Sequence, residues 1–334
     1  MERILLGETD IEVSRVGLGT WAMGGVMWQN EPDEDAAVKT VRQAIDIGIT
    51  TIDTAPDYGL GNSEAYIGKA LSQAGIARDQ VQLLGKPGVN WNKDKELFRD
   101  MRPDKVETEL DNTLRRLNTD YLDLYQIHWP DHEAGMEQMG EVMNKLYEKG
   151  KIRAVGVSNF TPDEMEELRR YVPLHTTQNQ YNMFQRELKP WFEYAERNHI
   201  AGITWGTFAH SLLTGKVDAQ STFTDEDIRA SLPLYQNNSR NYYLAAVREL
   251  QEFAHERNKT IAQLAARWTL ENPGISMCLW GARAPEQIKE AEGVDGWILD
   301  QEEMEHIEDI LAKHVPSLQD NQLNIYAPPE RSDV

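Results

Sequence analysis

The chain has 334 residues, and its 55 acidic and 34 basic residues give a formal net charge of −21. This excess of negative charge argues against binding to a nucleic-acid backbone or to an anionic membrane surface. No apolar stretch approaches the roughly 18 residues of a membrane-spanning helix, and charges interrupt the N-terminal segment, so we expect neither a membrane anchor nor a secretion signal. The single cysteine, Cys278, excludes an intrachain disulfide and fits a cytoplasmic protein.

Short β-branched or apolar runs recur along the chain, and an amphipathic helical stretch follows each one. The eight expected strands begin near Val16, Ile49, Val81, Tyr121, Ile152, Leu174, Ala201 and Ile275. Strict alternation of strand and helix implies parallel strands with helical crossovers, and eight such units close into a (β/α)8 TIM barrel. Because no linker or composition shift interrupts the pattern, we expect one α/β domain over residues 1–334.

Local signals mark individual helices and two irregular segments. Thr161 and Glu164 form the pattern of a capping box, and Pro103 is a residue favoured at a helix start. The seventh unit is enlarged, since a long loop is expected from Lys216 to Arg240. The C-terminal tail, residues 314–334, has little periodicity and is either disordered or lies across a mouth of the barrel.

Reactive side chains end three consecutive predicted strands. Asp53 ends the second strand and Tyr58 lies in the turn after it, while Lys86 ends the third strand and His128 the fourth. In this barrel the C-terminal ends of the strands face the active site, so these side chains are expected to meet there, although a surface position is the ordinary alternative for each residue alone. Together they suit the protonation of a carbonyl oxygen while hydride reaches the carbon. Lys86 would lower the pKa of the Tyr58 phenol, Asp53 would hold Lys86, and His128 would donate to the carbonyl oxygen.

The motifs around these residues resemble those of the aldo-keto reductases. They occupy residues 52–64, 126–131 and 156–160, and the likeness extends in order from Gly17 to about Ala312. The resemblance implies NADP(H)-dependent reduction of aldehydes or ketones. It assigns Asp53, Tyr58, Lys86 and His128 to the catalytic tetrad of the family, with Tyr58 as the proton donor. The segments 279–283 and 309–316 look most like a bacterial branch that reduces small aldehydes such as glyceraldehyde, so small or hydroxylated aldehydes and sugars are the expected substrates.

The resemblance also implies how the cofactor is bound. It assigns these residues to cofactor binding: Gly19, Thr20, Trp21, Ser158, Asn159, Gln178, Trp205, Gly206, Thr207, Phe208, Ser211, Leu212, Thr214, Gly215, Lys216, Gly281, Ala282, Arg283 and Gln287. The polar side chains on the fifth and sixth strands would bind the nicotinamide carboxamide, Trp205 would stack on its ring, and residues 206–216 would face the pyrophosphate. A guanidinium suits a 2′-phosphate, so Arg283 favours NADP(H) over NAD(H).

Aromatic side chains and departures from the family pattern complete the expected site. The tryptophans Trp21, Trp28, Trp91 and Trp129 are predicted to wall the substrate pocket. Many relatives carry proline at the positions of Thr207 and Trp280, asparagine at that of Ala291, and an Arg-Gly pair at His210–Ser211. These differences affect the assignment of cofactor affinity but not that of the tetrad.

Two weaker motifs are set aside, and two alternative functions remain open. The glycine-rich segment 17–25 has misplaced glycines for a dinucleotide-binding turn of the Rossmann type. His128, Asp131 and His132 invite a metal site, but Pro130 prevents a regular helical pair, and we expect no metal. The alternatives to an aldehyde reductase are a cofactor-binding regulatory subunit with little turnover and a metal-dependent sugar isomerase on the same barrel. The sequence indicates no oligomeric state.

Overall fold

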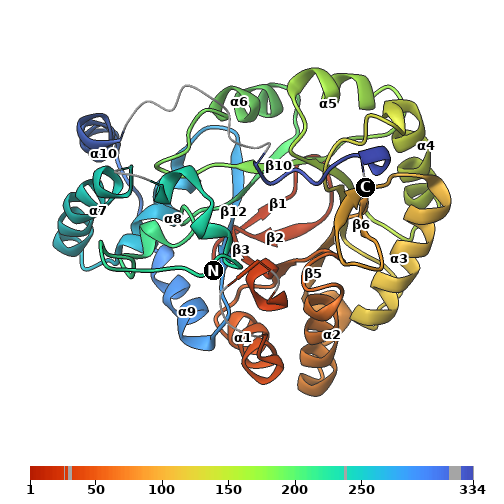
Figure 1. Cartoon of the computed structure of the whole chain (residues 1–334), viewed down its shortest axis with the longest axis horizontal. Coiled ribbons are helices and arrows are strands. Elements are labelled where there is room, and N and C mark those ends of the chain that lie inside the picture. The colour runs from red at the N-terminus through yellow and green to blue at the C-terminus, as the bar shows by residue number, and fades with distance from the viewer. Residues whose placement is uncertain (26, 29–31, 237–238, 316–324, 334) are drawn as a thin grey trace.

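Eight parallel strands close into a barrel in the order β10-β11-β12-β3-β4-β5-β8-β9 (Figure 1). The computed structural model describes residues 1–25, 27–28, 32–236, 239–315 and 325–333. The barrel strands are β3 (Val16–Gly19), β4 (Thr51–Asp53), β5 (Gln82–Gly85), β8 (Leu124–Ile127), β9 (Val155–Ser158), β10 (Thr176–Gln180), β11 (Ala201–Trp205) and β12 (Ile275–Gly281). Each predicted strand start lies within three residues of the observed one, and the predicted (β/α)8 class is confirmed.

Helices surround the barrel and connect its strands (Figure 1). They are α1 (Glu34–Asp46), α2 (Asn62–Ala74), α3 (Pro103–Leu117), α4 (Gly135–Glu148), α5 (Pro162–Leu168), α6 (Lys189–Arg197), α7 (Ser239–Glu256), α8 (Ile261–Glu271), α9 (Pro285–Lys289) and α10 (Gln301–His314). Pro103 begins α3 as predicted, and Thr161 and Glu164 form the predicted capping box of α5. None of the helices in the described ranges combines the length and the apolarity needed to cross a bilayer.

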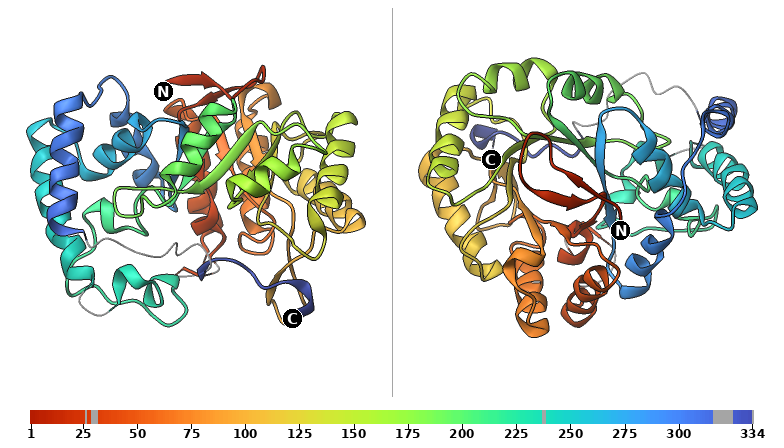
Figure 2. Two further views of the ribbon diagram at one scale, coloured as in Figure 1. Left: turned by 90° about the horizontal axis from the view of Figure 1, so that it is seen from above. Right: turned by 180° about the vertical axis from the view of Figure 1, so that it is seen from behind.

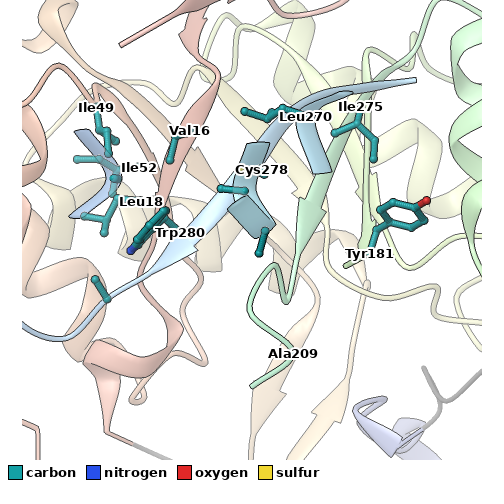
Figure 3. Close-up of a cluster of buried hydrophobic side chains, with 14 of the residues drawn as sticks. Val16, Leu18, Ile49, Ile52, Tyr181, Ala209, Leu270, Ile275, Cys278 and Trp280 are labelled. Atoms are coloured by element: carbon teal, nitrogen blue, oxygen red, sulfur yellow. The ribbon is translucent and has the colours of Figure 1, made fainter. Parts of the chain in front are cut away.

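Alternate residues of each strand pack on opposite sides of the barrel wall. On β3 and β12, Val16, Leu18, Cys278 and Trp280 belong to the core cluster between the strands and the helices (Figure 3). Leu279, one residue along β12, joins a separate cluster inside the barrel. This period of two is the geometry of a pleated strand whose two faces are both covered. Burial raises the pKa of the Cys278 thiol to about 12, so this side chain acts as a small core residue.

An N-terminal hairpin closes one end of the barrel. Its strands β1 (Arg3–Leu5) and β2 (Glu12–Ser14) pair antiparallel and lie across the barrel opening (Figure 2). Leu6, Ile11 and Val13 are buried in the cluster inside the barrel. The sequence analysis missed this hairpin because its strands are short. Since it fills the N-terminal end, the open mouth is the C-terminal one, where the strand ends carry polar residues.

The enlarged seventh unit contains more structure than the predicted loop. Short 3₁₀ turns at Leu212–Thr214, Ile228–Ala230 and Pro233–Tyr235 precede α7, which begins at Ser239, and residues 237–238 of the predicted loop lie outside the described residues. Helix α8 packs on β12 and is the crossover, whereas α7 packs on α10 (Figures 1 and 2). The seventh unit therefore carries one helix more than the repeating pattern requires.

The described part of the tail lies across the C-terminal mouth of the barrel. Residues 316–324 of the predicted tail lie outside the described residues, and the chain continues from Ile325. The backbone N–H of Arg99 donates to Pro329 O at 2.9 Å, and its guanidinium lies 2.9 Å from the Glu330 carboxylate. Arg331 pairs with Asp100 at 3.1 Å. Of the two alternatives for the tail, the described residues 325–333 adopt the position across the mouth.

Candidate active site

The C-terminal mouth of the barrel contains a cavity of about 560 Å³. The ends of the barrel strands, the long loop after β11 and the tail form its walls. This volume is in the range of small-molecule and cofactor pockets. Asp53, Tyr58 and His128 line the cavity, while Lys86 lies directly behind them and is almost completely buried. The structure thus brings together the four residues predicted from the strand ends.

Lys86 connects the other charged and phenolic groups of this cluster. Its Nζ lies 2.5 Å from Asp53 Oδ2 and donates to the Tyr58 hydroxyl oxygen at 3.1 Å. The second Asp53 oxygen accepts a hydrogen bond from Gln178 Nε2 at 2.9 Å. Because the ammonium donates to the phenol oxygen, the hydroxyl hydrogen of Tyr58 is left to point elsewhere. This arrangement can deliver a proton from Tyr58 into the cavity.

Burial and nearby carboxylates hold the Tyr58 phenol in its protonated form. Burial is the main cause that raises its pKa well above the usual value, and the negative charges of Asp53 and Asp57 add to it. The predicted lowering of this pKa by Lys86 is not observed, since Asp53 at 2.5 Å compensates the ammonium charge. Tyr58 is therefore a proton donor rather than a ready base near neutral pH.

Two glycines fix the turn that carries Tyr58. A Cβ placed on Gly24 would lie 2.4 Å from the Gly59 nitrogen and 2.5 Å from the Tyr58 carbonyl carbon. Gly59 also has a φ of +67°, a conformation that side chains other than that of glycine rarely adopt. The glycine-rich segment at residues 17–25 therefore packs backbone to backbone against the turn of Tyr58. This contact gives the segment a role without a dinucleotide-binding turn.

Buried hydroxyl groups join this turn to the strand ends. Ser63 Oγ donates to Thr20 Oγ1 at 2.7 Å, and Thr20 Oγ1 donates to the backbone oxygen of Asp53 at 2.8 Å. Thr54 Oγ1 lies 3.1 Å from Ser63 Oγ in the same chain of hydrogen bonds. Thr20, assigned to the cofactor by resemblance, lines the cavity but uses its hydroxyl within this network.

His128 faces Tyr58 across the floor of the cavity. The two rings meet edge to face with their centroids 5.7 Å apart. The backbone N–H of His128 donates to Pro87 O at 3.0 Å, and its carbonyl accepts from Asn159 Nδ2 at 3.1 Å. These contacts fix the backbone on both sides, so the imidazole is held where it can direct a carbonyl oxygen toward Tyr58.

The predicted carboxamide-binding residues are linked to one another. Ser158 Oγ donates to the backbone oxygen of Gln178 at 3.0 Å, and Trp205 Nε1 donates to Asn159 Oδ1 at 3.1 Å. The Gln178 amide nitrogen donates one hydrogen to Asp53 at 2.9 Å, which leaves its second hydrogen and the amide oxygen for a ligand. All four side chains line the cavity. The side chains of Ser158, Asn159 and Gln178 form a hydrogen-bonded polar wall, and the indole of Trp205 is joined to it through Asn159.

The loop after β11 is strained where it borders the cavity. Ala209, His210 and Ser211 have φ values of 44°, 52° and 85°. Consecutive left-handed residues with side chains are costly and are found mainly at ligand-binding and catalytic segments. The strain therefore supports a binding role for the loop that the resemblance assigns to the pyrophosphate.

Cations gather at this end of the cavity. Arg229 is buried and donates two hydrogen bonds to the Asp227 carboxylate, from Nε at 2.8 Å and from Nη2 at 2.6 Å. Its guanidinium lies 5.3 Å from the Trp28 ring and that of Arg283 lies 6.0 Å from the same ring. Burial lowers the pKa of Arg283, and the charge of Arg229 lowers it further. The sequence analysis missed Arg229, because its place in a long irregular loop gave no periodic signal.

Most predicted binding residues line the cavity, and a few do not. Those that line it are Gly19, Thr20, Trp21, Trp28, Trp129, Ser158, Asn159, Gln178, Trp205, Gly206, Thr207, Phe208, Ser211, Thr214, Lys216, Gly281, Ala282, Arg283 and Gln287. Leu212 instead packs in the core, and Gly215 ends a 3₁₀ turn with a φ of +69°. Trp91 lies in a hairpin of β6 (Val89–Trp91) and β7 (Leu97–Arg99) and is absent from the cavity wall. The sequence does not determine the exact path of the backbone in these loops, so it could not show that these three residues do not line the cavity.

Tyr326 of the tail is a wall residue that the sequence analysis missed. Its hydroxyl lies 2.8 Å from His210 Nε2, and the two rings stack with centroids 5.5 Å apart. It also meets the ring of Trp205 edge to face at 5.2 Å. Burial lowers the pKa of His210 to about 4, so this imidazole is neutral at physiological pH. The tail thus closes one side of the cavity beside the indole predicted to stack on nicotinamide.

The departures from the family pattern have structural roles. Thr207 Oγ1 donates to Leu279 O at 2.7 Å, and Trp280 Nε1 donates to Gln287 O at 2.9 Å. The side-chain oxygen of Gln287 accepts from the backbone N–H of Arg283 at 2.7 Å. Gln287 therefore orients the loop of Arg283 through its side-chain oxygen.

The residues of the metal hypothesis serve other purposes. Asp131 accepts hydrogen bonds from the backbone of Met101 at 2.7 Å and from that of Ala134 at 3.0 Å. The His132 ring lies between the carboxylates of Glu164 at 3.0 Å and Glu330 at 3.2 Å. Across the ranges that the structure describes, no group of three or more potential ligands could hold a metal ion.

The lining groups of the cavity suit a nicotinamide dinucleotide in their chemical order. Such a cofactor has a flat ring with a carboxamide at one end and anionic phosphates farther along. The cavity offers Trp205 and a polar wall beside the tetrad, followed by the strained loop and the cations Arg229 and Arg283. Glu290, 3.9 Å from Lys216, also lines it, so both signs of charge are present on its walls.

A parallel barrel with a buried lysine against a tyrosine phenol at its open mouth defines a class of carbonyl oxidoreductases. The Aldo/keto reductase family model matches residues 15–312 of the chain. The chain belongs to this family and is an oxidoreductase that acts on carbonyl compounds.

Several known proteins are similar to this chain. Aldo-keto reductase YhdN of Bacillus subtilis is 43% identical over the full length of both chains. The NADH-specific methylglyoxal reductase of Escherichia coli is 33% identical, over 87% of this chain and 92% of that protein. The structure of the glycerol dehydrogenase AKR11B4 from Gluconobacter oxydans superposes with a TM-score of 0.88 at 39% identity, covering 96% of this chain and 98% of the other.

Proposed function

We propose that this protein reduces small or hydroxylated aldehydes, ketones and sugars to alcohols with NADPH, reversibly, and that Tyr58 donates the proton. The observation that carries the proposal is the contact of Lys86 with Tyr58 at 3.1 Å and with Asp53 at 2.5 Å, next to a cavity of about 560 Å³. Nicotinamide, when bound, supplies the hydride. The cavity provides a proton donor, Tyr58, and a group that can orient the carbonyl oxygen, His128.

Each member of the tetrad has a distinct task in this proposal. His128 donates to the carbonyl oxygen and directs it toward the Tyr58 hydroxyl. As negative charge develops on that oxygen, Tyr58 transfers its proton, and the Lys86 ammonium stabilises the resulting phenolate. Asp53 keeps Lys86 charged and oriented. In the reverse direction the phenolate form of Tyr58 accepts the proton of the alcohol.

The walls of the cavity support small oxygenated substrates. Four aromatic side chains line it with flat apolar faces next to the polar groups of the tetrad: Trp21, Trp129, Trp205 and Tyr326. Two similar proteins are named for the small oxygenated compounds methylglyoxal and glycerol. The likeness supports substrates of this size for the present chain.

Cofactor preference is proposed from charge. Arg283 and Lys216 line the proposed phosphate end of the cavity and favour the additional phosphate of NADPH, while Asp227 compensates the charge of Arg229. Because Glu290 lines the same cavity and one relative is named as NADH-specific, the assay must compare the two cofactors directly. The unpaired, buried Cys278 supports a cytoplasmic location, and the net charge of −21 argues against nucleic-acid partners.

The proposal is tested by following the loss of NADPH absorbance with a panel of short-chain, hydroxylated and aromatic aldehydes. Tyr58→Phe should reduce turnover by roughly 10²- to 10⁴-fold, while NADPH still quenches the protein fluorescence. Retained turnover in this variant would refute Tyr58 as the acid. The second candidate, a regulatory subunit, predicts that the unaltered protein binds NADPH but turns over none of the aldehydes.

A further inference from the structure

The carboxylate of Asp57 and the imidazole of His128 face each other at the mouth of the barrel. Asp57 Oδ1 lies 3.3 Å from His128 Nδ1, and the two side chains are 9% and 10% exposed. Both atoms are buried, and in the described part of the chain neither has an aligned hydrogen bond. The tetrad predicted from the sequence does not include Asp57, although this residue lines the same cavity.

Backbone hydrogen bonds hold the turn that carries Asp57. The N–H of Tyr58 donates to Ala55 O, and the N–H of Leu60 donates to Asp57 O, each at 3.2 Å. His128 is held from its own side by its backbone bonds to Pro87 and Asn159. Two anchored loops therefore bring the carboxylate and the imidazole together.

The protonation state of Nδ1 decides whether this contact is favourable. A bare Nδ1 would present its lone pair to a buried carboxylate oxygen, leaving two unsatisfied polar atoms in contact. A hydrogen on Nδ1 converts the same contact into a charge-assisted hydrogen bond after a small rotation of either side chain. We propose that Asp57 is a positioning residue that keeps a hydrogen on His128 Nδ1 and so fixes the orientation of the ring.

This arrangement has a consequence for the carbonyl donor, which rests on the proposed function. With Nδ1 carrying a hydrogen, Nε2 is left as the ring nitrogen for the cavity. Donation from Nε2 to a carbonyl oxygen then requires a ring that carries both hydrogens, with the Asp57 carboxylate compensating its positive charge. A ring in that state would stabilise the negative charge that develops on the carbonyl oxygen better than a neutral ring does.

The other groups around the ring are consistent with this role for Asp57. Tyr58 faces the ring from the same turn, with 5.7 Å between the centroids. Lys86 and Asp53 lie beyond Tyr58 and compensate each other at 2.5 Å. The neighbouring strand contributes the neutral amide of Asn159, which contacts the His128 backbone. Among these groups, Asp57 is the acceptor that faces Nδ1.

The experiment combines nitrogen NMR with kinetics. The protein is labelled with ¹⁵N-histidine, and the His128 ring signals are assigned from their loss in His128→Asn. In the unaltered protein near neutral pH, Nδ1 should show the shift and proton coupling of a nitrogen that carries hydrogen. Asp57→Asn should retain that signal because its amide oxygen still accepts, whereas Asp57→Ala should shift it toward an unprotonated nitrogen.

The kinetic readout separates positioning from cofactor binding. Asp57→Ala should lower kcat by roughly 10- to 100-fold, the range for losing a group that orients a functional histidine. The Kd of Asp57→Ala for NADPH should stay within about twofold of that of the unaltered protein. The kcat of Asp57→Asn should lie between those of Asp57→Ala and the unaltered protein. Asp94→Ala, at an exposed turn between β6 and β7, is the matched control and should change neither the NMR signal nor kcat.

The outcomes of this experiment and of the functional test are distinguishable. An Nδ1 without hydrogen in the unaltered protein overturns the inference, whatever the protein reduces. Unchanged His128 signals and kcat in Asp57→Ala also overturn it, while the Tyr58→Phe result would still support the proposed function. If Asp57→Ala does not fold, Asp57→Asn decides, because it should keep the Nδ1 hydrogen and show a kcat lowered only part of the way, through loss of the carboxylate charge. An unchanged kcat in Asp57→Asn would then overturn the inference.

Discussion

Replacing Lys86 by methionine should destabilise the protein by about 3 kcal/mol, because it leaves a buried charge without its partner. The Lys86 side chain is 0% exposed and that of Asp53 is 2% exposed, with 2.5 Å between the charged atoms. Removing one member of such a pair costs roughly 3–5 kcal/mol. Gln178 still donates to Asp53 at 2.9 Å, which favours the low end of that range. Methionine fills similar space, so the contribution from a cavity is small.

Urea unfolding of Lys86→Met, Asp53→Asn and the double variant tests this reasoning as a double-mutant cycle. If the uncompensated Asp53 charge is the cause, the double variant should be about 1–2 kcal/mol more stable than Lys86→Met. Lys86→Met and the double variant should both lose turnover, because in each of them the phenol of Tyr58 has lost its contact with the Lys86 ammonium. A double variant no more stable than Lys86→Met would refute the electrostatic account.

A surface lysine in a pair of equal length provides the control. Lys145 Nζ lies 2.5 Å from a Glu107 oxygen, but the Lys145 side chain is 50% exposed. Exposed pairs contribute roughly 0–1 kcal/mol because water screens both charges. Lys145→Met should therefore leave both the urea midpoint and turnover nearly unchanged.

Three further predictions concern cofactor choice and stability. Arg283→Ala should weaken NADPH roughly 10- to 100-fold in fluorescence titrations and NADH much less, since a hydrogen bond to a charged group contributes about 1.5–3 kcal/mol; equal weakening would contradict a 2′-phosphate role. Ser211→Gly should raise the free energy of unfolding by about 1 kcal/mol, because φ is +85° and glycine relieves the left-handed strain; lower stability in urea would contradict this. Burial raises the pKa of Glu109 well above 4.5, so the stability that this group contributes is present below that pH and is lost as pH rises through the folded pKa. Glu109→Gln should thus gain stability over the unaltered protein between about pH 5 and pH 8, and a difference independent of pH would count against the buried carboxylate.

The sequence by itself determined the repeating architecture and the tetrad. Apolar runs and helical stripes specify strand and helix locally, and eight alternating units have a natural closed solution in the barrel. Asp53, Lys86 and His128 were predictable because parallel strands bring their C-terminal ends to one face. Tyr58 was predictable because it immediately follows such an end in a tight turn.

Only the tertiary structure decided how the aperiodic segments complete the site. Arg229 of the long loop and Tyr326 of the tail reach the cavity through contacts distant in sequence, and Leu6 of the N-terminal hairpin closes the opposite end of the barrel in the same way. The pairing of Asp57 with His128 likewise depends on two loops anchored to different strands. Local propensity carries no information about such contacts, because their geometry follows from the packing of the whole barrel. The sequence thus supplies the chemical groups at the strand ends, and the packing decides which of them face one another.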